Sequence, residues 1–270
     1  MLAACGGGGG GSASGSSNTT SPDAVTTLKS YDDGSGVLAV ESIYGSSADG
    51  PRNGLIVAPD LTVAREIALG TVNLEVVPGS VSQSGPFYAV TRRGTASNGA
   101  SLEVATVGEN LNLSGTEYAS ISLVTADGEL GIISGGTPLD GIPSDPSGPY
   151  TYTGNASVFS TATNVGGDGT FTLTADFSNN TGTLAATVPA NSSTGANNPE
   201  FFFSSNDLKI NPSDGGFSSS NALIGQSGVT SNAASVNGYF AGKDAAGVHG
   251  VVYTNDPTAP AYGGAFYGSR

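Results

Sequence analysis

The sequence is short of several chemically versatile residues. Its 270 residues include one cysteine, one histidine, one methionine and no tryptophan. A single cysteine excludes an intrachain disulfide. One cysteine and one histidine also cannot supply the ligands of a zinc site, so we expect no metal site. No run of eighteen apolar residues occurs, which argues against a membrane-spanning helix.

Basic residues are also scarce. Eight lysines and arginines stand against 22 acidic residues, which gives a net charge of -14. An acidic surface repels phosphate backbones, so nucleic acid is not expected as a partner. The same charge balance suits either plain solubility or a basic partner.

Recognisable catalytic groupings are missing from the sequence. A Ser-His-Asp triad needs a placed histidine, and the single one, His249, lies on an expected strand. The chain contains no G-x-S-x-G elbow, and no pattern marks a pair of catalytic carboxylates. We therefore expect a protein that is not an enzyme.

Short β-forming runs dominate what the sequence does contain. Val, Ile, Thr, Phe and Tyr recur in runs separated by Gly, Asn, Asp, Ser and Pro, and there are 42 glycines in all. No segment of ten or more residues has the 3.6-residue apolar period of a helix. This composition predicts an all-β fold of many short strands with tight turns.

The first residues, Leu2-Ala3-Ala4-Cys5, resemble the lipobox of bacterial lipoproteins. Small residues before the cysteine admit the signal peptidase, and the thiol accepts the lipid. The glycine run and the Ser/Gly/Asn/Thr stretch that follow are typical of a flexible tether. We expect residues 1–24 to be the end of a signal peptide and a disordered tether, with Cys5 as the lipid anchor in the membrane. Gly6, where some lipoproteins carry a retention aspartate, favours the outer membrane, at its cell-surface or periplasmic face.

Residues 25–147 are expected to form a β-rich N-terminal region. Pairs such as Asp33-Gly34 and Asp127-Gly128 mark turns between its strands. Its only basic pair, Arg92-Arg93, is expected at the solvated edge of a strand. The expected strands are 36–44, 54–57, 61–68, 71–77, 87–93, 101–107, 118–125 and 129–133.

Residues 148–270 are expected to form a separate β-barrel. The stretch 137–148 is rich in proline and glycine and predicts a linker, with the domain boundary near Gly148. About eight strands joined by short turns then suit an antiparallel up-and-down barrel, which leaves no free edge. The expected strands are 150–154, 170–177, 181–188, 200–210, 216–219, 236–241, 248–253 and 263–267.

Two local features of this region make specific predictions. In the strand 170–177, alternation places Phe171, Leu173, Ala175 and Phe177 on one face, and Asp176 should cap the turn that follows through backbone amides. The segment 166–169, Gly-Gly-Asp-Gly, echoes one calcium-binding repeat; a single copy has no neighbour to share an ion, so we expect a hairpin turn.

Four segments of the C-terminal region together resemble one family. They are Tyr150-Thr151-Tyr152-Thr153-Gly154; Ala175-Asp176-Phe177 with Thr181-Gly182-Thr183-Leu184; Val236 to Gly242 with Ala245 to Gly250; and Gly264-Ala265-Phe266-Tyr267-Gly268-Ser269-Arg270. In this order they resemble the β-barrel domain of transferrin-binding protein B and its surface-lipoprotein relatives. The resemblance covers about the last 120 residues and implies an eight-stranded barrel preceded by a smaller, handle-like β region.

The expected barrel interior follows from alternation within these segments. Phe177, Leu184, Phe240 and Phe266 should fill it. Glycines such as Gly238 and Gly250 should let strands bend or let an aromatic ring lie over the backbone.

The resemblance implies a binding protein and leaves its ligand open. One hypothesis is a lipoprotein that captures iron, haem or a metal-carrier protein from the host or environment and feeds a TonB-dependent receptor. The other is a structural or adhesive envelope lipoprotein that binds macromolecules without a transport role. No resident cofactor is expected; the alternative, implied by relatives that carry haem, is an axial ligand to haem. The candidate ligand-binding residues are His249, Tyr239, Tyr253, Tyr262 and Tyr267.

Overall fold

A computed structural model describes most of the chain beyond its first 28 residues. The described residues are 29–32, 38–46, 50–58, 74–95, 99, 101–113, 117–126, 129–143, 148–160, 165–190, 199–229, 231–254 and 262–270. Cys5, the tether and the strand expected at 61–68 lie outside these ranges. Within them, no helix is long and apolar enough to span a membrane.

The first nine strands form one antiparallel sheet, here called the N-terminal sheet. Its strands run in the order β1-β2-β3-β9-β8-β7-β6-β4, and the short β5 also pairs with β6. The sheet is open, with β1 and β4 at the ends of its order. Its strands are β1 (Lys29–Asp32), β2 (Leu38–Ser46), β3 (Gly50–Ala58), β4 (Leu74–Val76), β5 (Ser82–Ser84), β6 (Phe87–Thr95), β7 (Ser101–Asn110), β8 (Tyr118–Ala126) and β9 (Glu129–Gly136).

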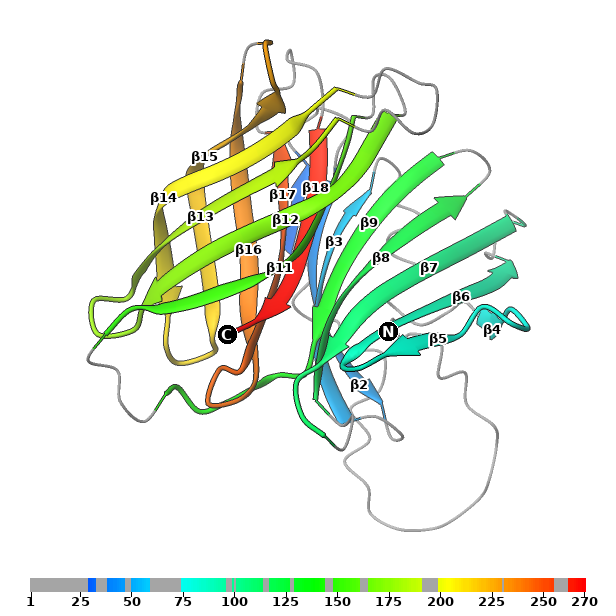
Figure 1. Ribbon diagram of the computed structural model, residues 1–270, viewed down its shortest axis with the longest axis horizontal. Coiled ribbons are helices and arrows are strands. Elements are labelled where there is room, and N and C mark those ends of the chain that lie inside the picture. Colours follow the sequence, from blue (N-terminus) through cyan, green and yellow to red (C-terminus); the bar gives the residue numbers. More distant parts are fainter. Residues whose placement is uncertain are drawn as a thin grey trace.

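Strands β11 to β18 form a closed antiparallel barrel beside this sheet (Figure 1). Each strand pairs with the next in sequence, and β11 pairs with β18 to close the ring. The predicted eight-stranded barrel after a β-rich region is thereby confirmed. Its strands are β11 (Tyr150–Ser160), β12 (Val165–Asp176), β13 (Thr181–Val188), β14 (Phe201–Asn211), β15 (Gly216–Gln226), β16 (Asn232–Lys243), β17 (Gly247–Thr254) and β18 (Tyr262–Ser269).

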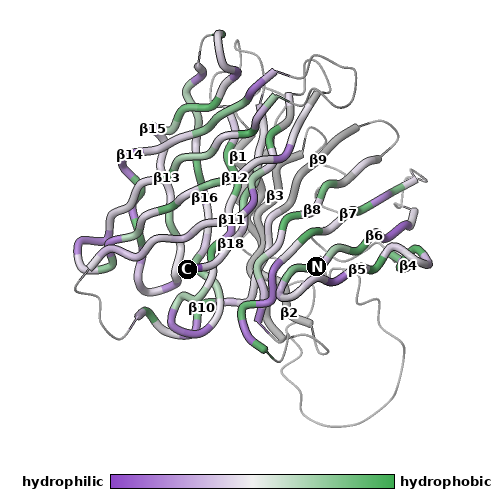
Figure 2. The backbone as a smooth tube through the Cα atoms, viewed as in Figure 1, coloured by the Kyte–Doolittle hydropathy of each residue, from purple (hydrophilic) through white to green (hydrophobic). Residues whose placement is uncertain are grey.

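Alternation along the strands builds the barrel core. Phe171, Leu173 and Ala175 of β12 are buried inside, as predicted, while the threonines between them are more exposed. Figure 2 shows hydrophobic and hydrophilic stretches along the backbone of the barrel strands. Phe240 lies at the centre of an aromatic cluster, with ring centroids 4.8 Å from Phe177, 5.2 Å from Phe217 and 5.3 Å from Tyr152. The core also contains Leu184 and Phe266, as expected.

Two glycines let aromatic rings lie directly over neighbouring strands. A Cβ at Gly250 would sit 2.6 Å from the ring of Phe266, and one at Gly238 would collide with the ring of Phe217. Both positions therefore need glycine for close approach rather than for an unusual backbone angle. This confirms the aromatic-over-backbone interpretation at these two sites.

The turn after β12 is capped as expected. The Asp176 carboxylate accepts hydrogen bonds from the backbone N–H groups of Ser178 and Asn179, at 3.0 and 3.1 Å, and from both of their side chains. These hydrogen bonds, that of the Ser178 side chain foremost, lower the pKa of Asp176 from 3.8 to about 2. The Asp176 side chain thus stabilises the turn after β12.

The structure corrects two predictions of local structure and adds two strands that were not predicted. The glycine-rich segment 166–169 forms no turn, because its residues pair with β11 from Ala156 to Phe159 at the start of β12. The expected linker contains a short strand, β10 (Leu139–Asp140), that pairs in parallel with the end of β16. Strands β1 and β5 were also not predicted; both are short and polar, so neither shows the apolar alternation that marks a strand.

Candidate functional site

The N-terminal sheet packs against the outer face of β17 and β18. Both strands are buried along almost their whole length because one face lines the barrel and the other meets β3, β7, β8 and β9 (Figure 1). Val248 and Phe266 point into the barrel core. The side chains between them, such as His249 and Tyr267, face the sheet. We call this contact region the junction.

His249 occupies the centre of the junction. Its Nδ1 lies 3.1 Å from the Ser134 hydroxyl of β9, and its ring centroid lies 6.0 Å from that of Tyr239. Burial lowers the pKa of His249 from 6.5 to about 3, so the imidazole is neutral at physiological pH. Its Nε2 has no hydrogen-bond partner among the described residues. Gly136 makes room for the ring, since a Cβ there would lie 2.7 Å from the His249 Cδ2.

The tyrosines of the candidate set divide between the junction and the barrel. Tyr253 and Tyr267 accept hydrogen bonds from the amides of Asn237 and Asn155, at 3.2 and 2.9 Å. Burial raises the pKa of Tyr267. Tyr262 instead faces the barrel interior, where its ring lies 6.1 Å from that of Phe201.

The structure therefore places His249 directly between its cross-strand partners Tyr239 and Tyr267, and it places Tyr253 four residues farther along β17 on the same face. All five are buried. A ligand could reach the four at the junction only if the sheet and the barrel parted. Their role in binding stays a prediction. Within the described ranges, no group of three or more His, Cys, Asp or Glu side chains could hold a metal ion.

Polar contacts join the sheet and the barrel at the end of the junction near the β16–β17 turn and the end of β18. Ser269 donates a hydrogen bond to the Glu109 carboxylate at 2.8 Å, and the backbone N–H of Lys243 donates to the Glu117 carboxylate at 3.0 Å. The N–H of Gly242 donates to the Thr137 carbonyl at 3.1 Å. Because these bonds join the sheet, the linker and the β16–β17 turn, the sheet is held in one position on the barrel.

The same face of the sheet continues beyond the junction and carries exposed apolar side chains. Residues paired directly across neighbouring strands lie on the same face of a sheet. Val107 pairs with Ile121, and Ile121 pairs with Ser134, which contacts His249. Val107 therefore lies on the face of the sheet that meets the barrel. Ile121 is buried, whereas Val107 is 39% exposed and Leu123 is 41% exposed. The residues of this apolar strip are Phe87, Ala89, Ala105, Val107 and Leu123.

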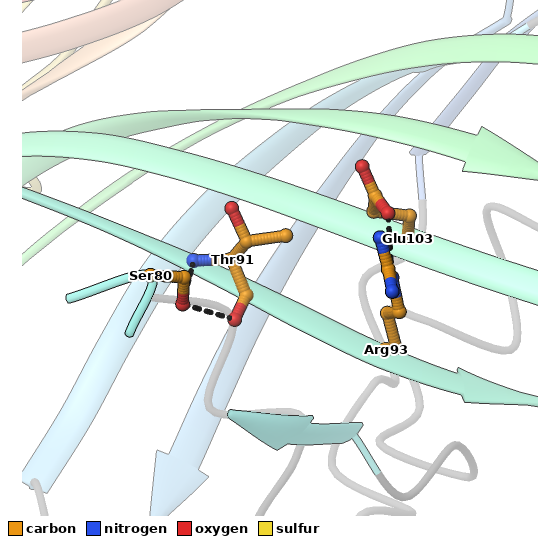
Figure 3. Close-up of polar contacts among 4 residues, drawn as sticks. All are labelled: Ser80, Thr91, Arg93 and Glu103. Carbon is orange, nitrogen blue, oxygen red and sulfur yellow. Dashed lines mark hydrogen bonds and ion pairs between the residues drawn. The ribbon is translucent and has the colours of Figure 1, made fainter. Parts of the chain in front are cut away.

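Charged and polar groups border the apolar strip. Arg93 and Glu103, opposite each other on β6 and β7, form an ion pair of 2.7 Å (Figure 3). Beside Ala89 on β6, the Ser80 hydroxyl donates a hydrogen bond to the backbone carbonyl of Thr91 at 3.0 Å and accepts one from its backbone N–H at 3.1 Å (Figure 3). The strip thus has an apolar centre and a polar rim, the usual anatomy of a protein interaction surface.

Sequence reasoning missed this strip, although the pattern was available. In β7, Leu102 and Val104 alternate with Ala105 and Val107, so both faces of the strand are apolar. A sheet with one solvated face normally alternates apolar and polar residues. The Arg92-Arg93 prediction was half wrong: Arg93 is solvated, but Arg92 is buried at 8% exposure.

Comparisons with known proteins identify similar solved structures. No protein-family model matches the chain, and no curated protein matches it. Transferrin-binding protein B, isotype 1, of serogroup B Neisseria meningitidis is 17% identical, with a TM-score of 0.44. Intact Ap-TbpB, with its N and C lobes, is 15% identical, with a TM-score of 0.47. A mutant of the Haemophilus parasuis Hp5 protein is 15% identical, with a TM-score of 0.43.

This chain spans about half or less of those structures. The alignments cover 73% of this chain and 36% of the Neisseria protein, and 86% of this chain and 52% of Ap-TbpB. For the Haemophilus protein the figures are 86% and 51%. These structures bear the name of the family that the four sequence motifs resemble.

Proposed function

We propose that this chain is a binding lipoprotein of the outer membrane, anchored through Cys5, that captures a carrier of iron, haem or another scarce metal. In this proposal it passes its cargo to a TonB-dependent receptor and catalyses no reaction. The observation that carries the proposal is the apolar strip beside the junction. Family resemblance in the barrel motifs supports the nutrient role.

The apolar strip favours a macromolecular ligand over a small one. Its side chains lie on an open sheet face, where exposed apolar residues grouped within a polar rim mark interaction sites. The junction holds this face rigid, so little conformational freedom would be lost when a partner docks. The four candidate tyrosines and His249 are buried away from such a surface.

Charge favours a basic partner for the strip. The chain carries a net charge of -14, and Glu103 and Glu109 lie at the edges of the strip. An acidic surface speeds the approach of a basic protein and loses this advantage at high salt. We therefore expect the association rate with the partner to fall as ionic strength rises.

The direct test compares two surface leucines. Leu123 in the strip is 41% exposed, and Leu223 on the barrel wall is 43% exposed, so each can be changed to serine with similar structural consequences. With iron-loaded transferrin and haemoglobin as probes, Leu123→Ser should weaken binding about tenfold and Leu223→Ser should leave it unchanged. Equal effects of the two variants would remove the strip from the site. Failure of the unmodified chain to bind either carrier would contradict the nutrient role.

Haem binding by the chain itself is tested separately. Titration of the purified chain with haem, followed in the Soret region, reports an axial ligand directly. The carrier-protein proposal predicts no Soret shift, because all five candidate ligands are buried. A shift that disappears in His249→Gln would instead place haem at the junction.

An adhesive role is the second candidate, and the strip favours it equally. A polar-rimmed apolar face suits any protein partner, whether or not that partner carries a nutrient. Binding of a cargo-free macromolecule in a Leu123-dependent manner, without binding of transferrin or haemoglobin, would select this alternative.

A further inference from the structure

The large side chains of the apolar strip lie in a row that follows from strand register. Phe87, Val107 and Leu123 are all exposed. Val107 pairs with Ala89, the second residue after Phe87, and Leu123 pairs with Ala105, the second residue before Val107. The three large side chains therefore form one diagonal row across β6, β7 and β8.

Small side chains lie beside this row. Ala89 and Ala105 are half-buried and occupy neighbouring positions on β6 and β7. An alanine extends only a methyl group from the sheet, so the large side chains of the row have space on one side. Side chains of a partner can pack there against both the alanines and the row.

The strands beneath the strip cannot extend their pairing to a partner. Each of β6, β7 and β8 is hydrogen-bonded to strands on both sides. A partner therefore contacts the strip through side chains alone. A helix satisfies its own backbone hydrogen bonds, so it can cover a sheet face without unpaired polar groups, whereas a lone strand laid on this face could not.

The length of the row matches a short helix. From Phe87 to Leu123 the row crosses two strand spacings and two steps of two residues, which is about 17 Å. A helix covers this distance with about eleven residues, or three turns. Apolar side chains at positions i, i+4 and i+7 lie on one face of such a helix and can contact the whole row.

Carboxylates border the strip at both ends. Glu109 lies directly across from Phe87, and Glu75 and Glu103 lie on either side of Arg93 at the other end. Among the described residues on this face of β4 to β8, Arg93 is the one basic side chain against these three acidic ones. Lysine or arginine residues beside the apolar face of a helix would complement this rim.

We propose that the apolar strip binds one amphipathic helix of the partner protein, with apolar residues on Phe87, Val107 and Leu123 and basic residues on its flanks. This inference rests on the proposed function, because it assigns a structural class to the partner of the same surface. The site continues an interface within the chain, since Val107 pairs with Ile121, which is buried at the junction. An apolar helix face on an apolar surface is a recurrent mode of protein recognition.

The test uses two synthetic peptides of identical composition, each of about fifteen leucine, lysine and alanine residues. In the first peptide the leucines recur at the helix spacing i, i+4 and i+7; in the second they occupy every second position, the spacing of a strand. Fluorescence anisotropy of the labelled peptides measures their Kd for the full chain. Because the described elements of the chain are all strands, a helical difference signal in far-ultraviolet circular dichroism reports that the bound peptide is helical.

Two alanine variants locate the bound peptide. Ala105→Leu fills the space beside the row, and Ala185→Leu makes the same change at an exposed position of β13 on the outer wall of the barrel. The helix-spaced peptide should bind the unmodified chain and Ala185→Leu alike, become helical on binding, and bind Ala105→Leu about tenfold more weakly. The strand-spaced peptide should bind the unmodified chain at least about tenfold more weakly than the helix-spaced one. If Ala105→Leu does not fold, Leu123→Ser and Leu223→Ser supply the same comparison.

Three results would overturn the helix proposal: equal affinity of the two peptides, equal Kd values for the two alanine variants, or no binding of the helix-spaced peptide. The carrier proteins distinguish these failures from failure of the proposed function. Leu123-dependent binding of transferrin or haemoglobin together with any of the three results would keep the carrier role and refute the helix. Binding of the helix-spaced peptide at the strip, when neither carrier binds, would refute the carrier role alone.

Discussion

The barrel and the N-terminal sheet use their residues in different ways. In the barrel, every strand is paired on both sides, and the interior is filled by aromatic and aliphatic side chains such as Phe240 and Phe266. The sheet is open, with edge strands β1 and β4. It buries polar groups such as Thr106, Ser122 and Arg92, and it exposes apolar ones such as Leu123.

This difference separates stability from binding. A closed barrel has no free edge, and its packed core gives it cooperative stability. Exposed apolar residues do not stabilise a fold, so those of the apolar strip support the binding surface proposed for the sheet. We therefore propose that the barrel is the scaffold and that the sheet carries the recognition surface.

The largest expected effect is the loss of a barrel-core ring. Phe240→Ala removes a side chain that contacts Phe177, Phe217 and Tyr152, and it should lower the free energy of unfolding by about 4 kcal/mol. Urea denaturation measures the change. A loss below about 1 kcal/mol would mean that the barrel core does not dominate stability.

The next effect tests the junction. Gly136→Ala would place a Cβ 2.7 Å from the His249 ring, and it should cost about 1–3 kcal/mol of unfolding free energy because the sheet must shift. Gly148→Ala is the matched control, since nothing lies within 4 Å of a Cβ there. Similar stabilities for the two variants would show that the sheet does not pack closely on β17.

The third effect is a pH dependence centred on His249. The folded protein keeps this imidazole neutral down to about pH 3, whereas the unfolded chain takes up a proton near pH 6.5. The unfolded state therefore binds more protons in this window. Stability is full above about pH 6.5 and falls toward pH 3, by up to about 1.4 kcal/mol per pH unit.

Variants separate this effect from that of the carboxylates. His249→Gln should flatten the decline between pH 6.5 and 4 in unfolding measurements. Asp176 contributes stability that is present above pH 3.8 and is lost as pH falls toward 2. Asp176→Asn should therefore lower stability by a constant amount above pH 3.8 and change the slope of the pH dependence only below it. An unchanged slope above pH 4 in His249→Gln would contradict the buried, neutral histidine.

The smallest effect is expected in the apolar strip. Leu123→Ser should change the free energy of unfolding by less than about 0.5 kcal/mol, because a partly exposed side chain away from the core contributes little to it. Its consequence should appear in binding alone. A loss of stability as large as that of Gly136→Ala would make the strip part of the fold rather than a docking surface.

Sequence patterns predicted the barrel better than the sheet. In β12 and β13, residue-by-residue alternation marks the inner face, and the segment 181–188 was predicted with its observed limits. Glycine-rich 166–169 was misjudged because strand pairing with β11 overrides the turn propensity of glycine. The fold class therefore followed from local patterns, and the exceptions came from pairing between distant segments.

The surroundings of the candidate residues were harder to predict from the sequence than the fold. His249 and Tyr267 alternate with core residues on β17 and β18, so their outward direction was implicit, but the sheet that covers them is distant in sequence. Burial of Arg92 depends on the register of β6 against β4 and β7, which no local pattern specifies. The junction and the apolar strip arise from tertiary packing.

The most direct test of the division between scaffold and recognition is the affinity of the two leucine variants for haemoglobin and iron-loaded transferrin. Surface plasmon resonance on the unmodified chain, Leu123→Ser and Leu223→Ser measures it under one set of conditions. We predict an approximately tenfold weaker Kd for Leu123→Ser and an unchanged Kd for Leu223→Ser. Equal Kd values for the two variants would contradict the assignment of recognition to the N-terminal sheet.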